Sequence, residues 1–127
     1  MRRVLVVERD SLLRALIAEW LAAAGAEAII PDAELPSATA RNVEAIVVDV
    51  EGPRQAHEVL SAWRKAYPHA AIIAVSGRFL GTCVADDSAA ARLGATRLLA
   101  KPFTRQQLWT ALSLRTSNAP HEAQRAS

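Results

Sequence analysis

Short runs of apolar, mostly β-branched residues recur along the chain, and polar or turn-forming residues follow each of them. Runs of this length predict strands. Where Val, Ile and Ala continue without alternating with polar residues, the pattern indicates a strand that is covered on both faces of a sheet. Five strands are therefore expected, at residues 3–7, 26–30, 45–49, 70–76 and 96–100.

Helical periodicity fills most of the stretches between these strands. Residues 11–24 carry apolar side chains three and four positions apart, and Gly25 provides a C-terminal stop. Further helices are expected at residues 56–66, at 86–93 and, after the N-cap Thr104, at 104–114. The first helix is expected to bury one face, which consists of Leu12, Leu13, Leu16, Ile17, Trp20 and Leu21.

Two apolar residues are neighbours on the last predicted helix, Leu108 and Trp109. Adjacent residues of a helix point in different directions, so we expect one of the two to point away from the core. An exposed Trp109 or Leu114 would favour a contact with a partner or with a second copy of the chain on this helix.

The strict alternation of strands and helices predicts an α/β fold. Right-handed crossovers then give a parallel sheet with helices on both faces. We expect one folded domain over residues 1–115, with its weakest segment between Pro31 and Val43. From Thr116 the composition changes to Ser, Asn, Pro, His, Glu, Gln and Arg, which predicts a flexible tail over residues 116–127.

Composition and charge exclude several classes of protein. The 127 residues carry a net charge of +2 and their arginines are scattered, so nucleic-acid binding is not indicated. No stretch of 18 apolar residues or signal-like segment is present, which argues against a membrane protein. The single cysteine, Cys83, excludes an internal disulfide and fits a reducing compartment, and we expect a cytoplasmic protein.

Candidate functional residues lie where the predicted strands end. Open α/β sheets carry their sites at the carboxyl ends of the strands. An acidic and basic cluster with Glu8 and Arg9 follows the first strand, Asp49 ends the third, Ser76 ends the fourth and Lys101 follows the fifth. Asp49 taken alone would be read as a strand-end residue that caps the next loop, but the set as a whole favours a common site.

This set resembles the receiver domain of two-component response regulators. The resemblance rests on the acids after the first strand, an Asp followed four residues later by Pro53, Ser76-Gly77 after the fourth strand, and Lys101-Pro102-Phe103 after the fifth. It covers about residues 3–114 and implies a flavodoxin-like, doubly wound five-stranded parallel sheet of strand order 2-1-3-4-5. The implied function is that of a single-domain response regulator in a phosphorelay and not that of an enzyme.

The resemblance also implies roles for individual residues. Asp49 would accept a phosphoryl group from a histidine kinase or phosphotransfer protein, Ser76 would hydrogen-bond a phosphoryl oxygen, and Lys101 would pair with it. Positive charge and positioning are what such a transfer requires. Lacking an output domain, the protein would signal through a downstream protein partner, and a homodimer through the face of its fourth helix, fifth strand and fifth helix is left open.

Arg9 departs from the family pattern, because it stands where the family usually has a second acid that binds Mg²⁺. The side chains of Glu8, Arg9, Asp49 and Lys101 sum to a formal charge of zero. A neutral pocket offers little to a hard cation that prefers oxygen ligands. The expectation is a weak or absent Mg²⁺ site, with Glu8, Asp49 and Glu51 as its candidate ligands.

Three interpretations of Arg9 are open from the sequence. In the first, the Arg9 side chain points to solvent and Mg²⁺ binding is lost without replacement. In the second, the guanidinium enters the pocket and pairs with Asp49 or Glu8, as a permanent cation in place of the metal. In the third, Asp10 or Glu51 restores metal binding. The second interpretation also allows the alternative function, a pseudo-receiver that acts as a phosphorylation-independent binding adaptor.

Two further features narrow the function. The position on the fifth strand where many receivers carry a switching aromatic residue is Leu98, so ordinary packing is expected there. A small flavodoxin-like enzyme or nucleotide-binding protein is disfavoured, because no glycine-rich phosphate loop follows the first strand and no nucleophile–base pair is visible.

Overall fold

The computed structural model describes residues 2–31, 42–51, 53–77, 91 and 94–113, and the sheet, helices and contacts are those of these residues. Several predictions lie outside them: the helix at 86–93 except for residue 91, the position of Cys83, the side chain of Leu114 and the tail 116–127. Within the described part of the chain, no helix has the length and apolar character that crossing a membrane requires.

Five parallel strands form one sheet. They are β1 (Arg2–Val7), β2 (Ala26–Ile29), β3 (Val43–Asp49), β4 (Ala71–Ser76) and β5 (Arg97–Ala100). Their order across the sheet is β2-β1-β3-β4-β5, and each neighbouring pair runs parallel. The predicted fold class and strand order are therefore confirmed.

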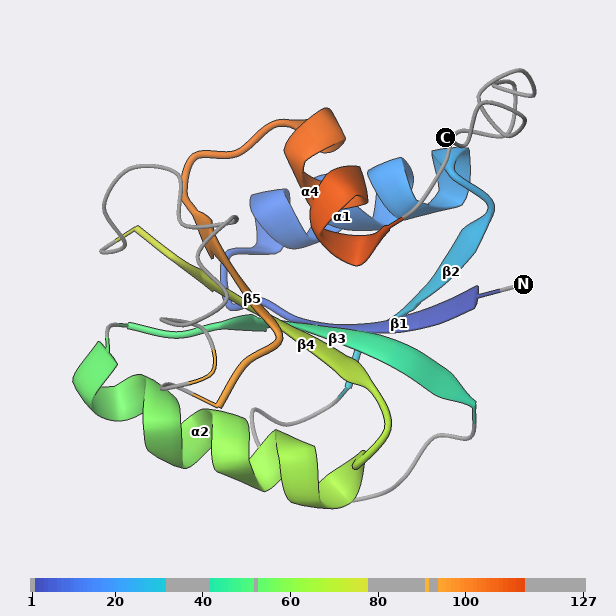
Figure 1. The fold of residues 1–127 in the computed structure, drawn as a ribbon. Helices are drawn as coiled ribbons and strands as arrows, with labels where there is room; N and C mark the ends of the chain where they lie inside the picture. The colour runs from blue at the N-terminus through green and yellow to red at the C-terminus, as the bar shows by residue number, and fades with distance from the viewer. Residues whose placement is uncertain (1, 32–41, 52, 78–90, 92–93, 114–127) are drawn as a thin grey trace.

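Helices cover both faces of the sheet, as Figure 1 shows. Helices α1 (Ser11–Ala23) and α4 (Arg105–Leu112) lie on one face, and α2 (Pro53–Ala66) lies on the other. Helix α2 begins three residues before the expected start at Ala56. Proline suits a first helical position, because its missing N–H would have no intrahelical partner there, and this explains the earlier start.

The sheet separates two apolar clusters. Alternate residues of the central strands point to opposite faces, so one cluster packs under α2 and the other under α1 and α4. The α2 cluster includes Trp63, which is fully buried, and Leu98, which packs there as expected. Because β3 and β4 are buried on both sides, their carboxyl ends are held rigidly where the candidate residues emerge.

Local capping sets the ends of α1. The Asp10 carboxylate accepts hydrogen bonds from the backbone N–H groups of Leu12 and Leu13, at 3.0 and 3.3 Å. This satisfies two donors that an uncapped helix leaves without partners. Gly25 adopts φ +81°, a conformation that favours glycine, so the predicted stop of the helix is confirmed.

The prediction that α1 buries a single face of six apolar residues is wrong in part. Ile17 and Leu21 are fully buried, whereas Leu12 is 82% exposed and Leu16 is 40% exposed. The apolar arc of α1 is wider than the strip that touches the sheet. Its outer row consists of Leu12, Leu16 and Trp20, which lie four residues apart. This row faces away from the sheet and leaves an apolar surface on the helix.

The prediction that either Leu108 or Trp109 points away from the core is also wrong. Leu108 is fully buried and Trp109 is only 4% exposed. Helix α4 contacts both the sheet and α1, so two of its sides are covered. Leu108 packs into the cluster on the sheet, and the Trp109 indole N–H donates a 3.0 Å hydrogen bond to the backbone carbonyl of Trp20.

Candidate functional site

The parallel register brings the candidate residues to one edge of the sheet. Val7 lies opposite Val48, Asp49 opposite Val75, and Ser76 opposite Ala100, so the next residues of each strand emerge side by side. The backbone N–H of Lys101 donates to the carbonyl of Ser76 at 3.0 Å, which anchors the end of β5 to that of β4. The four strand ends that the sequence singled out therefore meet.

Asp49 lies at the centre of this edge, and each of its two carboxylate oxygens is paired with a positively charged side chain. Lys101 Nζ lies 3.0 Å from Oδ1. On the other side, the Nε and Nη2 atoms of Arg9 each lie 3.1 Å from Oδ2. The Asp49 side chain is 9% exposed, so this carboxylate is largely removed from water and balanced by two positive charges.

Lys101 also joins Asp49 to a second carboxylate. Its Nζ lies 3.1 Å from Glu8 Oε2, and the Glu8 side chain is only 1% exposed. The other oxygen, Glu8 Oε1, is buried and has no hydrogen-bond partner among the described residues. A buried carboxylate is costly unless it is paired, and Glu8 Oε2 is paired with Lys101 and accepts a 3.1 Å hydrogen bond from the backbone N–H of Asp10.

The pKa of Lys101 is raised. Burial acts to lower it, but the hydrogen bonds that Lys101 donates to Asp49 and Glu8 outweigh burial. Lys101 is therefore charged throughout the neutral range. Because the pKa is higher in the folded state, this ion pair stabilises the fold below the ordinary Lys pKa, and its contribution is lost as pH rises through the raised value.

Arg9 bridges Asp49 to the exposed rim of the site. Its Nη1 donates to Glu51 Oε2 at 2.9 Å, and hydrogen bonds to Glu51 and Asp49 raise the pKa of Arg9. The side chain is 46% exposed but does not point away from the site. Of the three interpretations left open by the sequence, the structure has the guanidinium inside the pocket, paired with Asp49 and Glu51 and not with Glu8.

The predicted Mg²⁺ ligands do not assemble into a metal site. Among the described residues, no three His, Cys, Asp or Glu side chains are placed to hold a metal ion together. Lys101 lies between Glu8 and Asp49, and Arg9 lies between Asp49 and Glu51. Asp10, the other candidate for restoring metal binding, caps α1. Mg²⁺ requires oxygen ligands in near-ideal octahedral geometry, and this arrangement does not fit it.

Ser76 is 1% exposed and lies at the end of β4, on the strand next to Asp49. The structure thus brings Glu8, Asp49, Ser76 and Lys101 to one edge, as the sequence predicted, and adds the contacts of Arg9.

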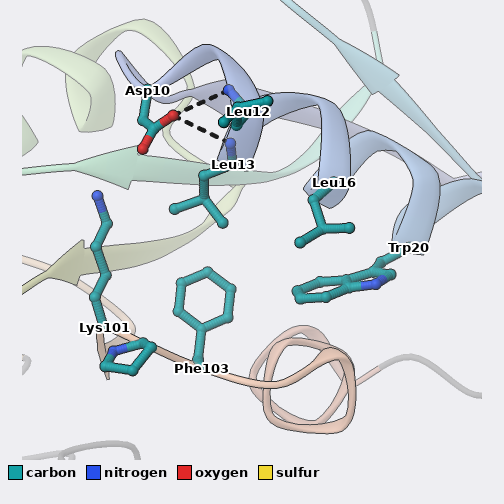
Figure 2. A pocket seen from close by; sticks show the side chains of 8 residues that line it. Asp10, Leu12, Leu13, Leu16, Trp20, Lys101 and Phe103 are labelled. Atoms are coloured by element: carbon teal, nitrogen blue, oxygen red, sulfur yellow. Dashed lines mark hydrogen bonds between the residues drawn. The ribbon is translucent and has the colours of Figure 1, made fainter.

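An apolar groove begins beside this pocket, and Figure 2 shows the side chains around it. It has a volume of about 530 Å³ and lies between the outer row of α1 and the segment that follows β5. Trp20 and Phe103 meet edge to face in its wall, with ring centroids 6.2 Å apart. The groove is lined by Asp10, Leu12, Leu13, Leu16, Trp20, Lys101, Pro102 and Phe103.

This groove was not predicted from the sequence, because all large apolar residues of α1 were expected in the core. The signal was present in the width of the apolar arc. Leu12, Leu16 and Trp20 repeat every four residues, next to the row of Leu13, Ile17 and Leu21. Two adjacent rows exceed what one contact with a sheet covers, and the outer row remains for another surface.

No protein-family model and no curated protein sequence matches the chain. Solved structures do resemble it. A response regulator receiver domain from Clostridium thermocellum is 21% identical, with a TM-score of 0.67 and full coverage of both chains. A receiver domain of a Francisella response regulator is 20% identical, with a TM-score of 0.69, covering 89% of this chain and 94% of its own.

A third similar structure bears on the metal. It is the receiver domain of the sensor histidine kinase PA1611 from Pseudomonas aeruginosa, described with a magnesium ion coordinated in its active-site cleft. It is 23% identical, with a TM-score of 0.68, covering 88% of this chain and 94% of its own. At these identities the likeness establishes the fold that the chain shares with these proteins.

Proposed function

We propose, starting from the receiver-domain fold of this chain, that it is the receiver of a response regulator in a phosphorelay and accepts a phosphoryl group at Asp49. The observation that carries the proposal is the position of Asp49 at the carboxyl end of β3, with Lys101 Nζ 3.0 Å from its Oδ1. A reactive carboxylate with a fixed cation beside it is suited to receiving a charged group.

The proposed donor is a phosphorylated histidine of a histidine kinase or phosphotransfer protein. An oxygen of Asp49 forms a bond to phosphorus as the phosphorus–nitrogen bond breaks, and the imidazole nitrogen keeps the electron pair of that bond. Lys101 and Arg9 face the two carboxylate oxygens and are placed to balance the charge that arrives. Ser76, on the adjacent strand, is proposed to hydrogen-bond a phosphoryl oxygen. The protein thus acts as an acceptor and not as an enzyme.

Intact-mass measurement after incubation with acetyl phosphate or a phosphorylated histidine kinase, with and without Mg²⁺, tests this proposal. We expect a hydroxylamine-sensitive phosphoryl adduct on the unmodified protein and none on Asp49→Asn. Glu44→Gln, which alters an exposed carboxylate outside the pocket, should be labelled normally. If no adduct forms under any condition, Asp49 is not a phosphoacceptor.

A second candidate, a phosphorylation-independent binding adaptor, is favoured by one observation. Both oxygens of Asp49 already pair with cations, which is a stable arrangement without any phosphoryl group. The labelling experiment separates the two functions, because an adaptor forms no adduct and its partner binds Asp49→Asn as well as the unmodified protein.

The donor is proposed to dock on the apolar groove. Lys101 borders both the groove and Asp49, so a protein that brings a phosphorylated histidine to Asp49 must lie over the adjoining surface. Leu16, from the exposed outer row of α1, lines that surface. Apolar side chains in the groove would lose contact with water when the donor covers them, which stabilises the complex.

Leu16→Asp is expected to slow phosphoryl transfer from a phosphorylated protein donor by at least about tenfold, because it places a charge in an apolar contact. Labelling by acetyl phosphate, which needs no docking surface, should be unchanged. Ile30→Asp serves as the matched control, because Ile30 is also an exposed apolar residue but does not line the groove. Equal loss with both donors would show damage to the pocket instead of loss of docking.

A further inference from the structure

Arg9 places its positive charge directly beside Asp49. Its guanidinium places two nitrogens 3.1 Å from Asp49 Oδ2 and a third 2.9 Å from Glu51 Oε2. The remaining oxygen of Asp49 is held by Lys101 at 3.0 Å. Both oxygens of the central carboxylate therefore already have positively charged partners.

The charge of the pocket is largely balanced before any metal ion binds. Glu8, Asp49 and Glu51 contribute three negative charges, and Arg9 and Lys101 contribute two positive charges, which leaves a single negative charge. Arginine stays protonated, so this positive charge is permanent. A divalent ion would have to compete for Asp49 with a guanidinium in direct contact with it, and the two would repel each other.

We infer that Arg9 excludes Mg²⁺ from this pocket and supplies in the metal's place the second positive charge that faces Asp49. The first part, exclusion of the metal, rests only on the contacts and charges above. The second part rests on the proposed function, because the charge matters for phosphoryl transfer only if Asp49 receives a phosphoryl group.

The planar geometry of Arg9 supports this role. Two of its nitrogens, Nε and Nη2, lie 3.1 Å from one oxygen of Asp49, and the same pair of nitrogens is suited to bind two oxygens of a phosphoryl group side by side. Arg9 is 46% exposed, so it can shift from Asp49 to an incoming phosphoryl group without repacking the core. Glu51, which is 62% exposed, holds the guanidinium at the rim in a weak surface pair.

Direct Mg²⁺ titration at constant ionic strength tests the exclusion, followed by the NMR shifts of backbone amides around the pocket. We expect no saturable binding to the unmodified protein over the range in which Arg9→Asp saturates. Arg9→Asp should bind at least about tenfold more tightly, because it removes a positive charge and adds an oxygen ligand. Arg97→Asp makes the same change in net charge at the opposite end of β5 from the pocket, and should behave like the unmodified protein.

Arg9→Gln removes the guanidinium without adding a carboxylate. It therefore distinguishes exclusion of Mg²⁺ by the guanidinium from the mere lack of a carboxylate ligand at position 9. We expect its Mg²⁺ affinity to lie between those of the unmodified protein and Arg9→Asp. If Arg9→Gln binds no better than the unmodified protein, the guanidinium does not exclude the metal and the inference is wrong. Thermal melts of each variant confirm that the fold is retained.

Labelling by acetyl phosphate with and without EDTA tests the second part. The unmodified protein should be labelled at the same rate in both conditions, whereas labelling of Arg9→Asp should require Mg²⁺. If EDTA abolishes labelling of the unmodified protein, Arg9 does not supply the positive charge in place of the metal. Complete absence of labelling would overturn the proposed function itself, and the titration would still decide whether Arg9 excludes the metal.

Discussion

Replacement of Lys101 by Met is expected to slow phosphorylation of Asp49 by acetyl phosphate at least about a hundredfold, the usual effect of removing one electrostatic group from a reaction centre. The Lys101 ammonium contacts Asp49 and is charged at neutral pH. Methionine keeps most of the length of the side chain but removes its charge. The initial rate of adduct formation, measured by intact mass, gives the effect.

The control for this prediction is Lys65→Met, which removes a charge from an exposed position on α2. It should leave the labelling rate unchanged. Lys101→Met also leaves the buried Glu8 without its ion-pair partner, so rates must be compared at temperatures where circular dichroism shows the variant folded. A Lys101→Met rate within about threefold of the unmodified protein would contradict the electrostatic role assigned to Lys101.

Replacement of Trp109 by Ala is expected to lower the free energy of unfolding by about 3–5 kcal/mol. Trp109 fills the space between α4 and α1, is 4% exposed, and donates a hydrogen bond to the Trp20 carbonyl. Truncation leaves a large cavity and an acceptor without its donor. Urea denaturation followed by circular dichroism measures the change.

Trp109→Phe retains most of the ring and loses the indole N–H, so its cost should be nearer to that of one hydrogen bond, about 1 kcal/mol, plus imperfect filling of the space. Leu12→Ala, at a position that is 82% exposed, should change stability by less than about 0.5 kcal/mol. If Trp109→Ala costs no more than Leu12→Ala, Trp109 does not contribute to the core.

The fold could be predicted from the sequence because its signals are local and repeated. Unbroken apolar runs identified the strands, and Thr104 and Gly25 identified helix ends that the structure confirms. The convergence of Asp49, Ser76 and Lys101 followed as well, since parallel strands present their carboxyl ends at the same edge. These inferences needed no knowledge of how any helix packs.

What could not be predicted depends on how elements pack against each other. Trp109 is buried because α4 lies against both α1 and the sheet, and Leu16 is exposed because α1 meets the sheet along a narrow strip. A periodic pattern shows how wide an apolar arc is, but not how many neighbours cover it. The direction of Arg9 was likewise open, because a long side chain at this position can point to solvent or pair with a carboxylate of the pocket.

Lys101 borders both the Asp49 pocket and the apolar groove, so the position of its side chain couples the two sites. A phosphoryl group on Asp49 would draw Lys101 toward new oxygens, and Pro102 and Phe103 follow it directly in the groove wall. Binding free energies at linked sites are reciprocal, so any partner whose affinity for the groove changes on phosphorylation must change the phosphorylation equilibrium by the same factor. A protein bound in the groove would thus help to determine how much phosphoryl group Asp49 retains.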